Sequence, residues 1–143
     1  MAQKKTAWRT GNTGISYLRV STPGQVDTEF GSEGLSLPAQ RRKCAERAAE
    51  MNRVIVDEYV EPGVTATSID KRKSYKAVLE RIHADPSISF VIVYATSRMN
   101  RNWEEDAVMG LTLRSLGVRY LSATEDLDDD DADKRAMRGF LAS

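Results

Sequence analysis

Residues 14–22 read Gly-Ile-Ser-Tyr-Leu-Arg-Val-Ser-Thr, and Pro23-Gly24 follows them directly. The apolar and β-branched residues predict a strand, and the proline-glycine pair predicts where it ends. Ser21 would then stand at the C-terminal end of the strand, the edge at which open α/β sheets bind ligands. Tyr17, Arg19 and Ser21 would share one face, because side chains alternate along a strand. By itself, however, this stretch fits an ordinary strand end with a Ser/Thr turn better than a catalytic site.

The rest of the chain alternates between strand and helix patterns. We expect further strands at residues 54–60, 88–95 and 118–122, and helices at 36–52, 73–83 and 103–116, with a last helix beginning at Lys134. Residues 88–95 form a nearly continuous apolar run, which is typical of a central strand buried on both faces. This order predicts an α/β fold, with a mainly parallel sheet and helices on both faces.

The helix patterns also predict which side chains face the core. In the second helix, apolar residues recur at the i, i+3, i+4 and i+7 spacing of an amphipathic helix, namely Tyr75, Val78, Leu79 and Ile82. In the first helix, small residues suggest a packing face made by Ala45, Ala48, Ala49 and Met51. In the third helix, we expect the inward residues to be Ala107, Val108, Leu111 and Leu116.

Composition excludes several classes of protein. The chain has 143 residues, the usual size of one domain. With Cys44 and His83 as the single cysteine and histidine, a disulfide framework and a typical zinc site are both excluded. Neither a signal peptide nor a membrane-length apolar run is visible, so a cytoplasmic protein is expected. No G-x-G-x-x-G or G-x-x-x-x-G-K-[ST] motif supports a dinucleotide or nucleotide cofactor.

The charge balance is neutral, with 21 basic and 21 acidic residues. A stand-alone nucleic-acid binder would carry a clear basic excess. If the substrate is a polyanion, the positive charge must therefore be local, or much of the affinity must lie outside this chain.

A second group of chemically unusual residues follows the central strand, in the sequence Ser97-Arg98-Met99-Asn100-Arg101. In a parallel sheet the ends of the first and third strands lie close together, so Arg98 and Arg101 would approach Ser21 and Arg19. Arg72 and Gln40, each at the start of a helix, could reach the same edge. A serine surrounded by arginines suits phosphoryl transfer, because guanidinium groups match phosphate oxygens and stabilise the charge of the transition state.

The combined pattern resembles the serine recombinases, which include the resolvases, the invertases and the large serine integrases. Residues 17–22 resemble the Y-x-R-V-S-T signature of that family, and residues 97–101 resemble its D-R-L-x-R motif. Four further positions match functional residues of the family, namely Gln25, Gln40, Glu61 and Arg72. The resemblance covers residues 14–143, and the long loop at 26–35 is more like that of large integrases or transposases.

The resemblance implies a resolvase-like three-layer fold with a mainly parallel four- or five-stranded sheet. It also implies that Ser21 attacks a DNA phosphodiester and becomes joined to the 5′ phosphate, without metal or cofactor. The implied catalytic residues are Ser21, Arg19, Arg98, Arg101, Arg72 and Gln40. The implied supporting residues are Tyr17, Gln25, Glu61 and Ser97, with Tyr17 ordering the site rather than reacting.

The same resemblance divides the chain into a flexible arm at 1–13, a catalytic domain at 14–133 and the start of a long dimerisation helix at 134–143. It implies double-stranded DNA as partner, held mainly by a region after residue 143, and dimers and tetramers of the full-length protein. No membrane partner is implied. Residues 1–143 alone are expected to fold but not to cleave DNA.

One departure from the family pattern is Ser97, which replaces the common aspartate and would weaken the ordering of the arginine loop. This departure and the neutral charge leave a second hypothesis open, namely an inactive regulatory or assembly domain of the same fold. A third is a small phosphoesterase that uses the same arginine-surrounded serine.

Overall fold

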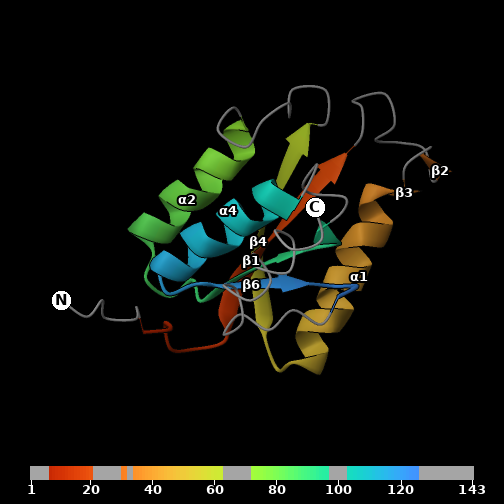
Figure 1. Cartoon of the computed structure of the whole chain (residues 1–143). Coiled ribbons are helices and arrows are strands. Elements are labelled where there is room, and N and C mark those ends of the chain that lie inside the picture. Colours follow the sequence, from red (N-terminus) through yellow and green to blue (C-terminus); the bar gives the residue numbers. More distant parts are fainter. Residues whose placement is uncertain (1–6, 21–29, 32–33, 63–71, 97–102, 126–143) are drawn as a thin grey trace.

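The computed structural model describes residues 7–20, 30–31, 34–62, 72–96 and 103–125. Its main sheet has four strands in the order β4-β1-β5-β6 (Figure 1). The strands are β1 (Thr13–Val20), β4 (Val54–Pro62), β5 (Phe90–Val93) and β6 (Arg119–Ser122). All neighbouring strands in this sheet are parallel, which confirms the predicted class of fold.

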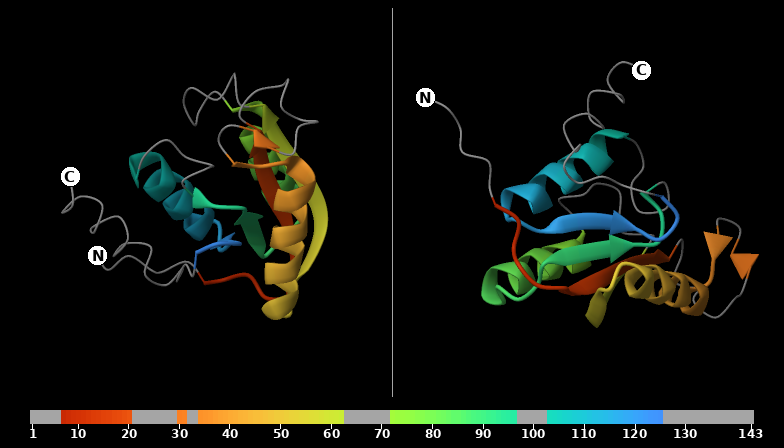
Figure 2. Two further views of the ribbon diagram at one scale, coloured as in Figure 1. Left: turned by 90° about the vertical axis from the view of Figure 1, so that its right-hand side faces the viewer. Right: turned by 90° about the horizontal axis from the view of Figure 1, so that it is seen from below.

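The helices that the structure describes between these strands are α1 (Leu37–Glu50), α2 (Lys73–Ala84) and α4 (Trp103–Ser115). Before α1, two short strands, β2 (Phe30–Gly31) and β3 (Gly34–Leu35), form an antiparallel pair. Helix α1 lies on one side of the main sheet and α4 on the other (Figure 2). The sheet is therefore the middle of three layers, and the helices predicted on both faces are present.

The strand order reverses its direction at β1. The chain passes from β1 to β4 on one side and then crosses to β5 on the other side of β1. In open α/β sheets such a reversal leaves a crevice beyond the carboxyl ends of the two strands. The predicted proximity of the first and third strands is confirmed, because Gly14, Ile15 and Ser16 of β1 pair with Phe90, Val91 and Ile92 of β5.

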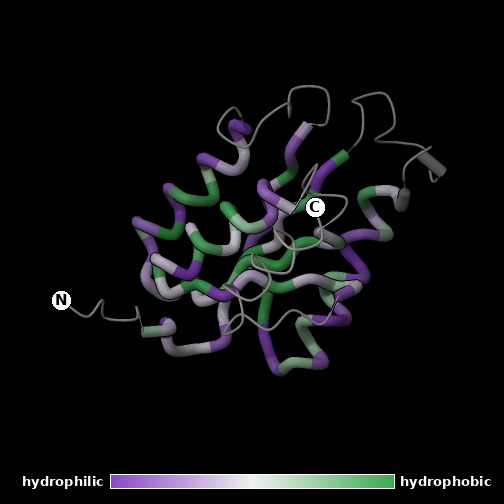
Figure 3. Tube along the Cα trace, viewed as in Figure 1, coloured by the Kyte–Doolittle hydropathy of each residue, from purple (hydrophilic) through white to green (hydrophobic). Residues whose placement is uncertain are grey.

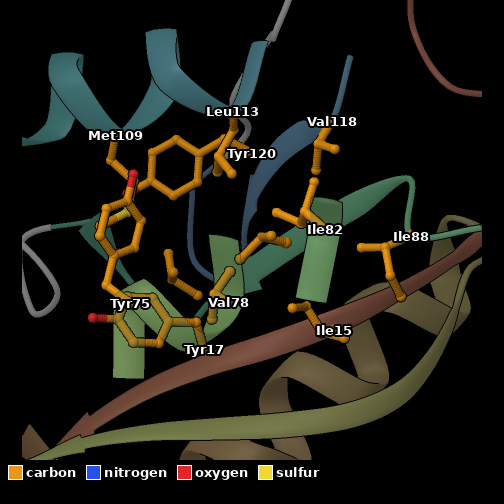
Figure 4. Packing of buried hydrophobic residues seen from close by; sticks show 12 residues of the cluster. Ile15, Tyr17, Tyr75, Val78, Ile82, Ile88, Met109, Leu113, Val118 and Tyr120 are labelled. Carbon is orange, nitrogen blue, oxygen red and sulfur yellow. The ribbon is translucent and has the colours of Figure 1, made fainter. Parts of the chain in front are cut away.

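Two apolar clusters fill the spaces between the layers. The first lies on the side of α2 and α4 and includes Ile15, Tyr17, Val78, Met109 and Leu113, among others (Figure 4). The second lies on the side of α1 and consists of Leu18, Cys44, Phe90, Ile92 and Leu121. Figure 3 shows hydrophobic residues concentrated along the central strands, with many hydrophilic residues along the helices. Adjacent β1 residues enter different clusters, as the alternation of strand side chains requires.

The ends of α1 and α2 follow from local sequence. Ser36 caps α1 by accepting a hydrogen bond from the backbone N–H of Ala39, and Pro38 occupies the first turn, where its missing N–H costs nothing. Helix α2 ends at Ala84, one residue before Asp85-Pro86. Its buried residues are Tyr75, Val78 and Ile82, as predicted from their spacing.

The predicted inward face of α4 is partly wrong, although Leu116 does pack against the first cluster. Val108 and Leu111 have 50% and 40% of their surface exposed, whereas Met109, Gly110 and Leu113 are buried. Apolar residues occur around most of this helix, so its periodicity does not identify one face. Packing against β6 and α2 makes the choice instead.

The small-residue face predicted for α1 is also partly wrong. Ala45 and Ala49 are exposed, and the side chains that pack on the sheet are those of Gln40, Cys44 and Ala48, four residues apart. Alanine carries too little apolar surface to decide the orientation of a helix, so larger side chains at the i, i+4 spacing determine it.

Part of the segment expected to be a flexible arm is packed against the domain. The Arg9 guanidinium donates to the backbone carbonyls of Ile82, Asp85 and Ile88, and thereby satisfies the C-terminal end of α2. Trp8 lies against the guanidinium groups of Arg114 and Arg119. None of the helices in the described ranges has the length and apolar character that crossing a bilayer requires.

Candidate active site

The candidate site lies where the C-terminal ends of β1 and β4 meet the N-terminal end of α2. Arg19 of β1 stands next to Glu61 of β4 in the parallel register. The Tyr17 hydroxyl donates to Glu61 Oε1 over 2.7 Å, and both side chains are fully buried. Ser21 follows β1 directly, so this buried pair lies just beneath the strand end that leads to the predicted nucleophile.

Glu61 also caps helix α2. Its carboxylate accepts hydrogen bonds from the backbone N–H groups of Ser74, at 3.3 Å, and Tyr75, at 3.0 Å. The N-cap residue Arg72 makes no side-chain cap of its own. The first N–H groups of a helix lack partners within the helix, and its dipole favours a negative charge there. A single carboxylate from β4 therefore fixes the start of α2 and orients the Tyr17 phenol.

Arg72 is the largest fully buried side chain of the described residues, with 0% of its surface exposed. Its Nη2 donates to Glu105 Oε1 of α4 over 3.2 Å. A guanidinium group cannot lose its proton in a protein, so burial requires a counter-charge of this kind. The pair joins the start of α2 to the start of α4.

Burial raises the pKa of Tyr17 well above its ordinary value. The hydrogen bond to Glu61 and the negative charge of that carboxylate raise it further, while the positive charge of Arg72 opposes them. The phenol therefore keeps its proton at physiological pH. As a hydrogen-bond donor it can order Glu61, but it is poorly suited to act as a nucleophile.

The opposite side of β1 contributes Gln40 from the first turn of α1. Its side-chain amide donates to the backbone carbonyl of Arg19 over 3.1 Å, and the residue is buried. This contact fixes the backbone two residues before Ser21. Gln40 was predicted to reach the active edge as a neutral donor, and it does so through the main chain of β1.

The described residues thus bring together half of the predicted site. Tyr17, Glu61 and Arg72 form one connected group, and Gln40 and Arg19 form a second contact beside it. The other predicted residues lie outside the described residues: Ser21, Gln25, Ser97, Arg98 and Arg101. Their roles remain predictions.

Two acidic residues near this edge were not predicted to be important. Glu105 holds Arg72, and Glu125 accepts hydrogen bonds from Thr96 at the end of β5. Glu105 is one of three consecutive acids in the first turn of α4, a pattern that only indicates a helix start. Glu125 begins an acidic run that suggests a solvated segment. Neither pattern identifies a partner that is distant in sequence.

Metal ligands and thiols are two further kinds of reactive group. Within the ranges that the structure describes, no group of three or more histidine, cysteine, aspartate or glutamate side chains is placed to hold a metal ion. Cys44, on the α1 side, is buried, and burial raises its thiol pKa to about 12, so it is not a reactive thiolate.

Comparison with protein families identifies the class. The model of the family described as "Resolvase, N terminal domain" matches residues 14–143. The chain therefore belongs to the resolvase family, and its fold is that of a serine recombinase catalytic domain. Comparison with curated protein sequences gives no significant match.

Solved structures with the same fold agree with this family. The N-terminal catalytic domain of TP901-1 integrase is 21% identical with a TM-score of 0.71, and the match covers 91% of each chain. A resolvase family site-specific recombinase from Streptococcus pneumoniae is 21% identical with a TM-score of 0.69, covering 92% of this chain and 88% of that one. The catalytic domain of ISC1926 TnpA, an IS607-like serine recombinase, is 14% identical with a TM-score of 0.62, covering 91% and 79%.

Proposed function

We propose that this chain is the catalytic domain of a site-specific DNA recombinase that cleaves and rejoins DNA through Ser21. The observation that carries the proposal is the buried Tyr17–Glu61–Arg72 group directly beneath the end of β1. A strand end that only turned the chain would not need a buried carboxylate, phenol and guanidinium below it, since burying such groups is costly without a purpose. Family membership and the Ser21 motif supply the chemistry.

In the proposed reaction, the Ser21 oxygen attacks a phosphorus atom of the DNA backbone. A bond forms between Ser21 and the 5′ phosphate, the bond to the 3′ oxygen breaks, and the Ser21 proton is passed on so that a 3′ hydroxyl leaves. After exchange of the ends, a 3′ hydroxyl attacks the phosphoserine and releases Ser21. One phosphate ester replaces another in each step, so the bond energy is conserved and no nucleotide is consumed.

Arginines stabilise the transition state in this proposal. Arg19, Arg98 and Arg101 hold the phosphate oxygens, on which negative charge accumulates. Arg72 acts differently, because its guanidinium is fully buried against Glu105. We assign it to holding the Tyr17–Glu61 pair and the start of α2, so it supports the nucleophile strand from below. Gln40 positions the same strand through the Arg19 carbonyl.

The partners in this proposal are double-stranded DNA and further copies of the recombinase. The net charge of the chain is zero, so nonspecific attraction to DNA phosphates is weak. Most of the DNA affinity is therefore assigned to a DNA-binding region outside residues 1–143. We call the protein that combines this domain with such a region the parent recombinase. Residues 1–143 alone should fold but not cleave DNA.

The decisive experiment maps a covalent protein–DNA adduct in the parent recombinase with a suicide DNA substrate. Ser21→Ala should bind DNA normally and form no adduct, whereas Tyr17→Phe, which keeps Ser21, should still form one. An adduct that persists in Ser21→Ala, or that maps to Tyr17, contradicts the proposal. Normal DNA binding with no adduct in the unaltered protein would favour a regulatory domain. Turnover of small phosphate esters that depends on Ser21 would favour a phosphoesterase.

A further inference from the structure

A carboxylate at the end of β6 binds the first residue of the segment that leaves β5. Glu125 Oε1 accepts the backbone N–H of Thr96 over 2.7 Å. The Thr96 hydroxyl lies 2.8 Å from Oε1 and 2.7 Å from Oε2 of the same carboxylate. Thr96 is therefore held through both its main chain and its side chain by one residue that lies 29 positions away in the sequence.

The carboxylate is itself held firmly. The Ser122 hydroxyl oxygen accepts the backbone N–H of Glu125 at 3.1 Å and that of Thr124 at 3.2 Å. The Ser122 hydroxyl in turn donates to the Tyr94 carbonyl oxygen, with 3.2 Å between the two oxygen atoms. The backbone N–H of Thr124 also donates to the Tyr94 carbonyl, which extends the backbone bonding between the two segments to the residue before Glu125. Glu125 thus stands on a rigid extension of the sheet.

This contact suits the local backbone. Thr96 lies three residues beyond the end of β5, where its backbone N–H is outside the strand ladder and needs another acceptor. Hydrogen bonds to an ionised carboxylate are about twice as strong as those to a neutral acceptor. Glu125 therefore fixes the orientation of Thr96, the last described residue before position 97.

We propose that Glu125 is a positioning residue for the segment that carries Arg98 and Arg101. This inference rests on the proposed function, in which those two arginines hold the phosphate. They follow Thr96 by two and five residues, so the orientation of Thr96 is transmitted to them through a few bonds. Ser97 has no carboxylate, and Glu125, three residues beyond β6, supplies one to the adjacent Thr96. This contact compensates for the departure from the family motif at position 97.

The first test measures positioning without any activity, in residues 1–143. Hydrogen exchange of the amides at Thr96 and at residues 97–102 is compared between the unaltered chain and Glu125→Gln, which has the same shape without the charge. We expect exchange at least about threefold faster in Glu125→Gln. Thr96→Val removes only the hydroxyl contact and should give a smaller increase. The control is Glu104→Gln. Glu104 is an exposed acid in the first turn of α4, and its replacement should leave the exchange rates at Thr96 and at residues 97–102 unchanged.

The second test measures cleavage of bound DNA in the parent recombinase. Glu125→Gln should slow cleavage about tenfold or more while DNA affinity stays within twofold, because small misplacements of catalytic groups are costly in rate. Adding Ser97→Asp to Glu125→Gln should restore at least about a third of that loss, because it returns a carboxylate to the residue that follows Thr96 directly. A role confined to the stability of β6 would not be rescued in this way.

The outcomes separate this inference from the function on which it rests. If the parent recombinase forms a Ser21 adduct but Glu125→Gln changes neither exchange nor cleavage, the role of Glu125 is refuted and the function stands. If no adduct forms at all, the function fails, and the exchange experiment still decides whether Glu125 orders the segment. Unchanged exchange at 97–102 in Glu125→Gln overturns the inference in either case.

Discussion

The two faces of the sheet pack against side chains of different chemical character. On the α1 side, the core consists of aliphatic and aromatic side chains with Cys44, and the buried amide of Gln40 donates to the main chain of β1. On the side of α2 and α4, three buried tyrosines pack beside the buried charges of Glu61 and Arg72. An apolar core is the cheaper way to stabilise a domain. We therefore expect the loss of a buried polar group on the side of α2 and α4 to cost more stability than a small apolar truncation on the α1 side.

On the side of α2 and α4, we expect the stability of the fold to depend most strongly on Glu61. Glu61→Ala should lower the free energy of unfolding by about 3–5 kcal/mol, because it leaves the Tyr17 hydroxyl and two helix N–H groups buried without an acceptor. Urea unfolding of residues 1–143 measures the change. Cys44→Ala, on the α1 side, should cost only about 1 kcal/mol. Equal losses in the two variants would show that the faces do not differ in this respect.

The Arg72–Glu105 pair should matter more for function than for stability. Glu105→Gln leaves the Arg72 charge buried without a full counter-charge and should cost about 2 kcal/mol, less than for a fully buried pair. Glu105 keeps 16% of its side-chain surface exposed, which moderates the loss. Replacing both residues, in Arg72→Met with Glu105→Leu, should restore stability to within about 1 kcal/mol of the original.

The same double variant in the parent recombinase should still bind DNA but should lose most of its cleavage activity. Urea unfolding and the suicide-substrate assay, carried out on the same set of variants, separate the two effects. Full cleavage by the stable double variant would show that the pair is only structural.

The buried phenol predicts a specific dependence on pH. Burial raises the pKa of Tyr17 above the ordinary value of 10.0. Below pH 10 the folded and unfolded chains both keep this proton, so its contribution to stability is fully present. Above pH 10 the unfolded chain loses the proton while the folded chain retains it, so stability falls by about 1.4 kcal/mol per pH unit. Tyr17→Phe should remove this part of the slope.

Unfolding measured between pH 8 and pH 11 tests this. Burial also raises the pKa of Tyr75, so Tyr75→Phe should remove a further part of the slope, and the two reductions should add approximately. At neutral pH, Tyr17→Phe should cost about 1 kcal/mol for the lost hydrogen bond to Glu61. If Tyr17→Phe shows the same dependence of unfolding free energy on pH as the unaltered chain, the assigned burial of Tyr17 is contradicted.

The smallest effects are expected on the outer surface of α4. Val108→Ala and Leu111→Ala should each change the free energy of unfolding by about 0.5 kcal/mol or less, because both side chains are largely exposed. Met109→Ala, one residue away on the same helix, should cost about 2–5 kcal/mol. Urea unfolding of the three variants therefore measures which side of α4 faces the core. A large loss of unfolding free energy in Val108→Ala would instead support the helix orientation predicted from the sequence.

Some features of this protein could be read from the sequence because they depend on neighbouring residues. The alternation of apolar residues in 14–22 predicts β1, and the spacing of Tyr75, Val78 and Ile82 predicts the inward face of α2. The order of strands and helices predicts the parallel sheet. The strand and helix patterns placed Tyr17, Gln40 and Arg72 near the active edge, and the resemblance to the serine recombinases added Glu61.

Only the tertiary structure decides how those residues act. The Tyr17–Glu61 bond joins residues 44 positions apart, and the Arg72–Glu105 pair joins residues 33 positions apart. No local pattern encodes such contacts, because they arise from the register of β1 with β4 and from the docking of α4 beside α2. For the same reason the exposed side of α4 could not be predicted, since a helix that is apolar on several sides takes its orientation from the surface it meets. The sequence determines which groups are available, and the packing of distant segments determines which become buried, charged neighbours.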